Sequence, residues 1–228
     1  MEEILPGALY LVSTPIGNLG DMTFRAVEIL KSVSIIAAED TRVSRILLDK
    51  YQINNSIISF HSYNQRKQTP ILITKLIRGD SVALVSDAGT PGISDPAFVL
   101  VKECVTKGIR IIPVPGASAM LAGLTTSGLT TNRFVFEGFL PQKKGRQTRL
   151  AKLALEERTI VLYESPHRLS KTMNALLEFF GDRKCAIARE LTKKFEEIFH
   201  GYISEFIAHL ENHPPRGEYV LIIAGKEK

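Results

Sequence analysis

Short apolar runs recur through the first half of the chain, and each is continuous rather than alternating with polar residues. Their ranges are Ala8–Ser13, Ser34–Ala38, Ser56–Phe60, Ser81–Ser86 and Arg110–Pro113. Continuous runs are typical of strands buried on both faces, whereas strands with one wet face alternate. Amphipathic helical stretches separate the runs. The first half is therefore predicted to form βαβ units with a mainly parallel sheet.

Two of the expected helices have clear end signals. Asp95-Pro96 supplies a cap and a first-turn proline before Ala97–Lys107, and Ser165-Pro166 precedes His167–Phe180 in the same way. A glycine directly follows each helix, which is the usual residue at a helix C-terminus.

The second half differs in its strand pattern. The predicted strands are Phe134–Glu137, Thr159–Tyr163, Lys184–Arg189, Phe195–His200 and Glu218–Ala224. Only a few residues separate the third and fourth of them, which favours a hairpin and hence a mixed sheet. We expect an α/β protein of two α/β domains, residues 1–117 with a mainly parallel sheet and 118–228 with a mixed sheet.

Composition places the chain among ordinary globular proteins. It has 228 residues, 44% hydrophobic and 23% charged, with a net charge of +5. The first residues have neither a basic segment nor an apolar one, and no run approaches a membrane span, so we expect a cytoplasmic protein with no membrane partner. Cys104 and Cys185 are isolated and are expected to be reduced thiols. The mild basic charge permits an anionic partner and also fits a plain basic surface.

Small and ionisable residues follow all five strands of the first domain. The segments that follow the strands are Ser13–Asp21, Glu39–Arg42, His61, Asp87–Asp95 and Pro113–Ala119. Ligands of open parallel sheets bind beyond these carboxyl ends. Each segment alone also fits a simple turn or helix cap, and none matches a dinucleotide or P-loop fingerprint. Five such ends in succession predict a site.

Seven blocks keep one order along nearly the whole chain: Leu11–Asp21, Ala37–Arg42, Leu84–Pro91, Pro113–Ala119, Phe136–Pro141, Tyr163–Arg168 and Ala188–Glu197. In this set the chain resembles the ribosomal RNA small subunit methyltransferase I family, bacterial 2′-O-ribose methyltransferases of the tetrapyrrole-methylase-like superfamily. The resemblance implies an enzyme that uses S-adenosylmethionine (SAM), bound in a cleft between the two domains. It also implies a homodimer. The substrate would be a decoding-centre cytidine of 16S rRNA, in the assembled 30S subunit.

The resemblance also implies cofactor contacts, carried over motif by motif. They are Pro15, Asp87, Ala88, Gly89, Thr90, Ile93, Ser118 and Ala119 in the first part, and Glu164, Leu191 and Thr192 in the second. Two features depart from the family pattern. Many relatives continue into a C-terminal helical extension, whereas this sequence ends soon after its last predicted strand. The block at Pro113–Ala119 varies among members, which leaves backbone roles there more secure than side-chain roles.

Methyl transfer to a ribose hydroxyl needs the acceptor oxygen in line behind the methyl group and a group that takes its proton. The candidates for the base are Glu39, Asp40, His61 and Asp87, and the Glu39/Asp40 pair is favoured, with Arg42 positioning a phosphate. Asp87 has an alternative role in orienting a loop or the cofactor. A basic segment, Lys143, Lys144, Arg146, Arg149 and Lys152, is a candidate contact for RNA phosphates. No His/Cys cluster suggests a metal.

Two other functions remain open at this stage. A tetrapyrrole C-methyltransferase would share the fold and the cofactor, and fold analogy alone does not exclude it. A non-catalytic RNA-binding module would leave the five strand ends unexplained. The identity of the base and the target nucleotide, and whether naked rRNA suffices, are not readable from the sequence.

Overall fold

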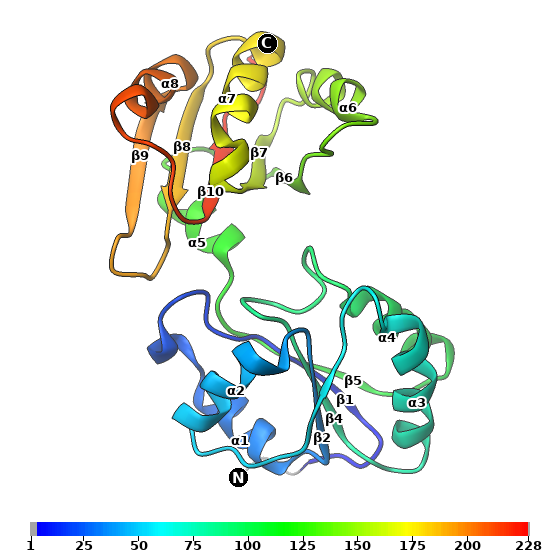
Figure 1. The fold of residues 1–228 in the computed structure, drawn as a ribbon. Coiled ribbons are helices and arrows are strands. Elements are labelled where there is room, and N and C mark those ends of the chain that lie inside the picture. The colour runs from blue at the N-terminus through cyan, green and yellow to red at the C-terminus, as the bar shows by residue number, and fades with distance from the viewer. Residues whose placement is uncertain (1–3, 228) are drawn as a thin grey trace. The chain divides into compact units, whose positions relative to one another are not determined.

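A computed structural model describes residues 4–227 and contains two compact units, with the boundary along the chain between Ser118 and Ala119 (Figure 1). The first unit has five strands, β1 (Leu9–Val12), β2 (Ile35–Ala38), β3 (Ile57–Ser59), β4 (Val82–Val85) and β5 (Ile111–Val114). All their pairings are parallel and the order across the sheet is β3-β2-β4-β1-β5. The predicted parallel sheet and its five strands are confirmed.

Helices cover both faces of this sheet. They are α1 (Phe24–Ser32), α2 (Thr41–Lys50), α3 (Gln65–Ile77) and α4 (Ala97–Thr106), with a 3-10 turn η1 (Leu19–Asp21) before α1. One apolar cluster joins α1 and α2 to the sheet, and a second joins α3 and α4 to the opposite face (Figure 1). Strand residues alternate between the two clusters, Leu9 in one and Tyr10 in the other. This double burial explains the continuous apolar runs.

The second unit has a mixed sheet in the order β6-β7-β10-β8-β9. Its strands are β6 (Phe134–Phe139), β7 (Thr159–Glu164), β8 (Lys184–Arg189), β9 (Glu197–Tyr202) and β10 (Tyr219–Ile223). Its helices are α5 (Ala119–Thr126), α6 (Arg146–Leu153), α7 (Pro166–Phe180) and α8 (Ile203–Asn212). β6 and β7 are parallel and the other pairs antiparallel, so the predicted mixed sheet is confirmed.

Helices also cover both faces of the second sheet. An apolar cluster joins α6, α7 and α8 to one face, and α5 packs on the other against β10. Gly123 makes the second contact close, because a Cβ at this position would lie 3.1 Å from Val220 Cγ1. Each sheet is therefore a middle layer between helices.

Some predicted boundaries move. The hairpin of β8 and β9 is present, but β9 begins two residues later than the predicted Phe195–His200. Asp95 lies one residue before the assigned cap of α4, yet its Oδ1 accepts the amide of Ala97 at 2.8 Å, as a capping carboxylate does. Cys104 and Cys185 are buried free thiols, as expected. No helix in the described residues is long and apolar enough to cross a membrane.

Candidate active site

Hydrogen bonds tie together the segments that follow β1, β4 and β5. Thr14 and Gly89 exchange backbone hydrogen bonds of 2.9 and 3.1 Å. Thr90 Oγ1 accepts the Ser13 hydroxyl at 3.2 Å and donates to the carbonyl of Ala117 at 3.3 Å. The three neighbouring strand ends therefore form one connected surface, in which most residues implied as cofactor contacts lie.

The backbone of this surface has left-handed residues and a close approach between two segments. Gly89 has a φ of +81°, in the left-handed region, and so does the non-glycine residue Ser94 at +67°. A Cβ at Gly116 would lie 2.9 Å from Ser13 Cβ. Strained residues at a strand end are concentrated at ligand sites, and glycines there let a ligand approach the main chain.

The residues implied as cofactor contacts differ in exposure. Pro15 is buried, whereas Ala88 and Ile93 are exposed, and Ser118 and Ala119 are half-buried on either side of the start of α5. Small residues and free surface of this kind fit an adenosyl group, which needs close backbone approach and few charged partners.

Glu39 follows β2 and lies between this surface and the end of β3. It lines a small pocket together with Phe60, Ser86 and Asp95. Burial raises the pKa of Glu39, and the charges of Asp87 and Asp95 raise it further, while the Asp87 amide and His61 oppose this shift. A carboxyl group with a raised pKa is a better proton acceptor near neutral pH than an ordinary one.

Asp40 has the opposite environment. Its carboxylate accepts the Arg42 amide at 2.8 Å as the cap of α2, and also binds the Arg42 guanidinium at 3.1 and 2.7 Å. These bonds hold the pKa of Asp40 at about 2. The structure therefore favours Glu39 over Asp40 as a base, because Asp40 has little affinity for a proton.

Asp87 and His61 flank this pair. Asp87 Oδ1 accepts the backbone amide of Asp40 at 2.8 Å, which joins the ends of β4 and β2 and supports the alternative role of Asp87 in orienting a loop. His61 Nδ1 accepts the amide of Tyr63 at 3.3 Å. The guanidinium of Arg42 is 89% exposed although it is paired with Asp40. The four candidate bases thus lie at the ends of β3, β2 and β4, which are neighbours in the sheet.

In the second unit, Glu164 at the end of β7 is 2% exposed. Its carboxylate accepts the Thr172 hydroxyl at 2.6 Å and the Ser165 amide at 2.9 Å, and forms an ion pair with Arg168 at 3.3 Å. The neighbouring Arg146, only 9% exposed, donates to Thr172 Oγ1 at 2.9 Å and to the Pro141 carbonyl at 3.3 Å. Both carboxylate oxygens of Glu164 are thus engaged inside its own unit.

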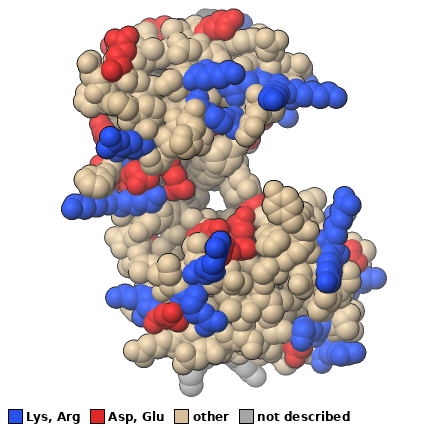
Figure 2. All heavy atoms as spheres, in the orientation of Figure 1, with Lys and Arg blue, Asp and Glu red and all other residues tan. Residues whose placement is uncertain are grey.

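The predicted basic segment divides into two parts. Lys143, Lys144, Arg149 and Lys152 are exposed, and Arg149 pairs with Glu137 at 3.0 Å. Arg146 faces inward, and burial lowers its pKa, so we remove it from the predicted RNA contacts. Lys and Arg side chains gather over α6 and α7 on the face shown in Figure 2. The hydrophobic pattern of α6 indicates the burial of Arg146, because position 146 shares a helix face with the buried Leu150 and Leu153.

The loop between β8 and β9 contains Leu191 and Thr192. Leu191 is buried, and Thr192 has a φ of +67°, close to Glu190 at +49°. β7 and β8 run in the same direction, since each is antiparallel to β10. This strained loop and Glu164 therefore lie at the same edge of the second sheet.

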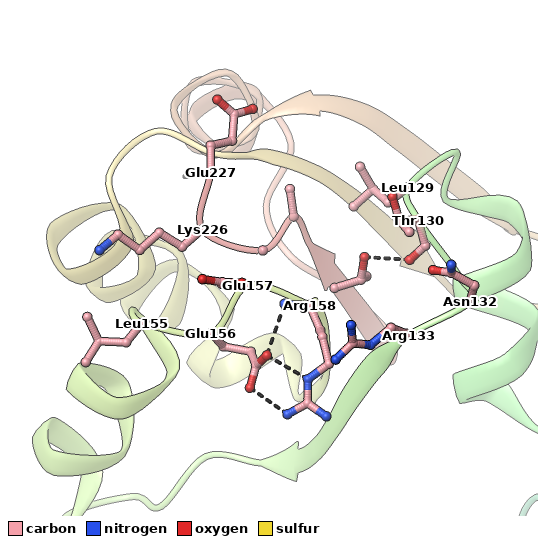
Figure 3. A pocket seen from close by; sticks show the side chains of 13 residues that line it. Leu129, Thr130, Asn132, Arg133, Leu155, Glu156, Glu157, Arg158, Lys226 and Glu227 are labelled. Carbon is pink, nitrogen blue, oxygen red and sulfur yellow. Dashed lines mark hydrogen bonds and ion pairs between the residues drawn. The ribbon is translucent and has the colours of Figure 1, made fainter.

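A larger pocket of about 550 Å³ lies elsewhere in the second unit (Figure 3). It is lined by the segments before β6 and β7 and by the end of the chain, with Arg158 paired to Glu156 at 2.7 Å. None of the predicted site residues lines it, and its three acidic and three basic side chains balance in charge. Within the described residues, no group of three or more His, Cys, Asp or Glu side chains has the arrangement of a metal site.

Comparison with known proteins shows which family the chain belongs to. Residues 8–207 match the family described as Tetrapyrrole (Corrin/Porphyrin) Methylases. A Synechocystis sp. protein named Ribosomal RNA small subunit methyltransferase I is 54% identical over 96% of this chain and 79% of its own length. A Thermotoga maritima protein of the same name is 47% identical over 97% of this chain and 100% of its own. This chain belongs to the ribosomal RNA small subunit methyltransferase I family.

Enzymes that act on other substrates have the same fold. The structure of a Thermus thermophilus uroporphyrin-III C-methyltransferase, solved in complex with S-adenosylhomocysteine, has a TM-score of 0.67 and 20% identity, with 95% of this chain and 97% of that chain covered. At this identity the likeness shows the fold alone. The assignment to the small subunit methyltransferase I family rests on the sequence relatives.

Two residues of this edge were not among the individually predicted site residues. Asp95 is the last residue of a predicted site segment and a predicted helix cap, and its charge also contributes to the raised pKa of Glu39. Tyr63 is 98% exposed next to His61, with a ring separation of 6.1 Å. The available signal was an aromatic residue three positions after a predicted strand and three before the pair Arg66 and Lys67.

Proposed function

We propose that this chain transfers a methyl group from SAM to the ribose 2′-hydroxyl of a cytidine in the decoding-centre region of 16S rRNA. Family membership supports an rRNA substrate. The observation that carries the chemistry is Glu39, a half-buried carboxylate with a raised pKa beside the connected ends of β1, β4 and β5. We further propose that the enzyme acts as a cytoplasmic homodimer on the assembled 30S subunit.

SAM supplies an electrophilic methyl group when bound. The segments containing Ala88, Gly89 and Thr90 would hold it through backbone groups, and the bonds from Thr90 to Ser13 and Ala117 keep those segments in place. A pre-formed site of this kind lowers the entropic cost of aligning two reactants.

Glu39 takes the proton of the ribose hydroxyl in this proposal. A ribose hydroxyl is a weak nucleophile while it keeps its proton, and a positioned base contributes roughly 10²–10⁴-fold to the rate. Asp40 and Asp87 fix the backbone around Glu39 rather than accept the proton, because Asp40 is committed to Arg42 and Asp87 to the Asp40 amide. Arg42 remains exposed enough to face a phosphate.

The exposed cations of α6 and the turn before it support RNA as the substrate. Lys143, Lys144, Arg149 and Lys152 are exposed and lie within ten residues of each other along the chain. We propose that these residues neutralise phosphates of the rRNA backbone.

Incubation with SAM labelled in its methyl group tests the function. The purified protein should label isolated small subunits that lack the modification, and should not label a uroporphyrinogen substrate. Naked 16S rRNA serves as a second acceptor and decides between free and assembled RNA. Labelling of the tetrapyrrole alone would replace this proposal by the alternative C-methyltransferase.

A further inference from the structure

The exposed aromatic side chains of the first unit lie near the starts of helices, at the end of the sheet where its strands finish. Within residues 4–118 they are Phe24, Tyr63 and Phe98, and each lies at or next to the start of the helix that follows a strand. Tyr63 is the most exposed of the three, at 98%. Its ring contributes almost nothing to the core of its unit, so packing does not account for it.

The turn that carries Tyr63 is nevertheless well fixed. Asn64 Nδ2 donates to Ser59 O at 3.0 Å and to Ser59 Oγ at 2.7 Å, while its Oδ1 accepts the His61 amide at 2.8 Å. The Tyr63 amide itself donates to His61 Nδ1. A rigid backbone therefore presents this ring to solvent, which lowers the entropic cost of stacking a planar ligand on it.

The strand order places Tyr63 on a particular side of Glu39. The cofactor surface follows β4, β1 and β5, Glu39 follows β2, and Tyr63 comes after β3 at the sheet's outer edge. Ala38 and Ser59 are register partners, and His61 lies close enough to act on the charge of Glu39. The acceptor oxygen must lie between the methyl group and Glu39, and β3 adjoins β2, so the turn that carries Tyr63 is next to the acceptor's place.

The surroundings of Tyr63 are basic. Arg66 and Lys67 are exposed in the first turn of α3, and no acidic residue accompanies them there. The helix dipole does not favour cations at this end, so helix stability does not explain them. Aromatic rings beside cations are the usual means of holding single-stranded RNA, in which the ring stacks on a base and the cations face phosphates.

We propose that Tyr63 stacks on a nucleobase of the RNA substrate next to the target ribose, with Arg66 and Lys67 facing the adjoining phosphates. This inference rests on the proposed RNA substrate and adds the direction from which it enters. Tyr63 is a positioning residue here: it orients the nucleotide and takes no part in proton transfer.

Steady-state kinetics on small subunits give the first test. Tyr63→Ala should raise the KM for the subunits about 10- to 100-fold, since the stacking of one base is lost. Tyr63→Phe should stay within about threefold of the parent, because it keeps the ring. The dissociation constant for SAM and the melting temperature should not change in either variant. Phe24→Ala removes another exposed ring at this edge, 93% exposed, and serves as the matched control.

Fluorescence gives a direct test, because the chain contains no tryptophan. Tyr63→Trp places a single tryptophan at the proposed stacking position, and a short single-stranded oligoribonucleotide should quench its emission. Inorganic polyphosphate, which carries charge but no bases, should not. Phe24→Trp should show no quenching with either probe.

Three results would overturn the stacking role. They are an unchanged KM in Tyr63→Ala, an equal loss in Tyr63→Phe, and quenching by polyphosphate to the same extent as by the oligoribonucleotide. A shift in SAM affinity in Tyr63→Ala would instead assign the ring to the cofactor. Failure of the parent protein to methylate small subunits at all is a separate outcome, which contradicts the proposed function.

Discussion

Glu39 and Asp40 are neighbours in the sequence, but their surroundings shift their pKa values in opposite directions. Burial and two nearby carboxylates raise the pKa of Glu39, whereas the bonds from Arg42 lower that of Asp40 to about 2. Environments that separate two carboxyl groups in this way assign their roles. The sequence alone could not choose between them, because the choice depends on which strand ends lie beside each side chain.

The first prediction concerns these two residues. Glu39→Gln keeps the shape and removes the base, so turnover should fall by about 10²-fold or more while SAM affinity changes little. Asp40→Asn should lose less than about tenfold, because asparagine also caps a helix well. Turnover numbers and calorimetric SAM affinities for both variants provide the comparison. A larger loss in Asp40→Asn than in Glu39→Gln would reverse the assignment.

The second prediction is a pH dependence that follows from the raised pKa of Glu39. The rate should fall as pH decreases through that raised pKa, at a higher pH than for an ordinary glutamate near ~4.3. A raised pKa in the folded state means that charging Glu39 costs stability. The contribution of Glu39 to folding stability is therefore fully present below its pKa in the unfolded chain. It is lost as pH rises through its pKa in the folded protein. At neutral pH, Glu39→Gln should thus melt no lower than the parent. A clear fall in its melting temperature would contradict the shift.

At the scale of elements, the close approach of two strand ends shapes the cofactor surface. The backbone of Gly116 touches Ser13, and Thr90 is hydrogen-bonded to segments on both sides. The motif pattern predicted which segments meet, since the carboxyl ends of parallel strands share an edge. It did not predict the bonds between them, because the strand order β3-β2-β4-β1-β5 depends on packing across the whole sheet.

Gly116→Ala provides the third prediction. The added Cβ would lie 2.9 Å from Ser13 Cβ, so the segments after β1 and β5 must move apart. SAM affinity measured by calorimetry should fall by about tenfold or more, as a cost of ~1–3 kcal/mol for overpacking implies. Gly20→Ala is a suitable control, because its Cβ would meet only the flexible side chain of Asn18. Equal affinities in the two variants would mean that this contact does not shape the site.

Element types were largely predictable, whereas the burial of two charged side chains was not. All ten strands lie where apolar runs indicated them. Glu164, a cofactor contact implied by the resemblance, and Arg146 of the basic segment are both buried, although charged side chains rarely lie in a core. Their burial is compensated by hydrogen bonds, because Thr172 Oγ1 accepts from the Arg146 guanidinium and donates to the Glu164 carboxylate. Such compensation joins residues that are distant in sequence, so no local pattern shows it.

At the scale of the whole molecule, the exposed cations of the second unit predict a salt-dependent contact with RNA phosphates. The fourth prediction replaces Lys143, Lys144 and Lys152 with alanine, which should flatten the slope of log K against log [salt] for rRNA binding by about 2–3 if each contacts a phosphate. The SAM affinity should not change. Replacing Lys31, Lys102 and Lys107 of the first unit, also exposed, removes the same charge and should leave the slope nearly unaltered.

Arg146→Ala distinguishes the buried arginine from these lysines. It should lower the melting temperature, because Thr172 Oγ1 and the Pro141 carbonyl lose a charged donor. The slope of log K against log [salt] for its binding to rRNA should equal that of the parent. Equal slopes for the two triple variants would show that α6 and its preceding turn do not bind RNA.

The family and the two-domain fold could be predicted from the sequence, because the motifs occur in order along the chain. The predicted cofactor cleft and the homodimer stay predictions. The fold does not determine the substrate either, because a tetrapyrrole methyltransferase has the same architecture.

Mass spectrometry of ribonucleosides tests the central claim most directly. Small subunits that lack the modification are incubated with the protein and methyl-deuterated SAM, and their 16S rRNA is digested to nucleosides. The account predicts one deuterated methyl group per subunit on the ribose of a cytidine, and its near-absence with Glu39→Gln. A methyl group found on a base, or no methylation of authentic small subunits by an enzyme that binds SAM, would contradict it.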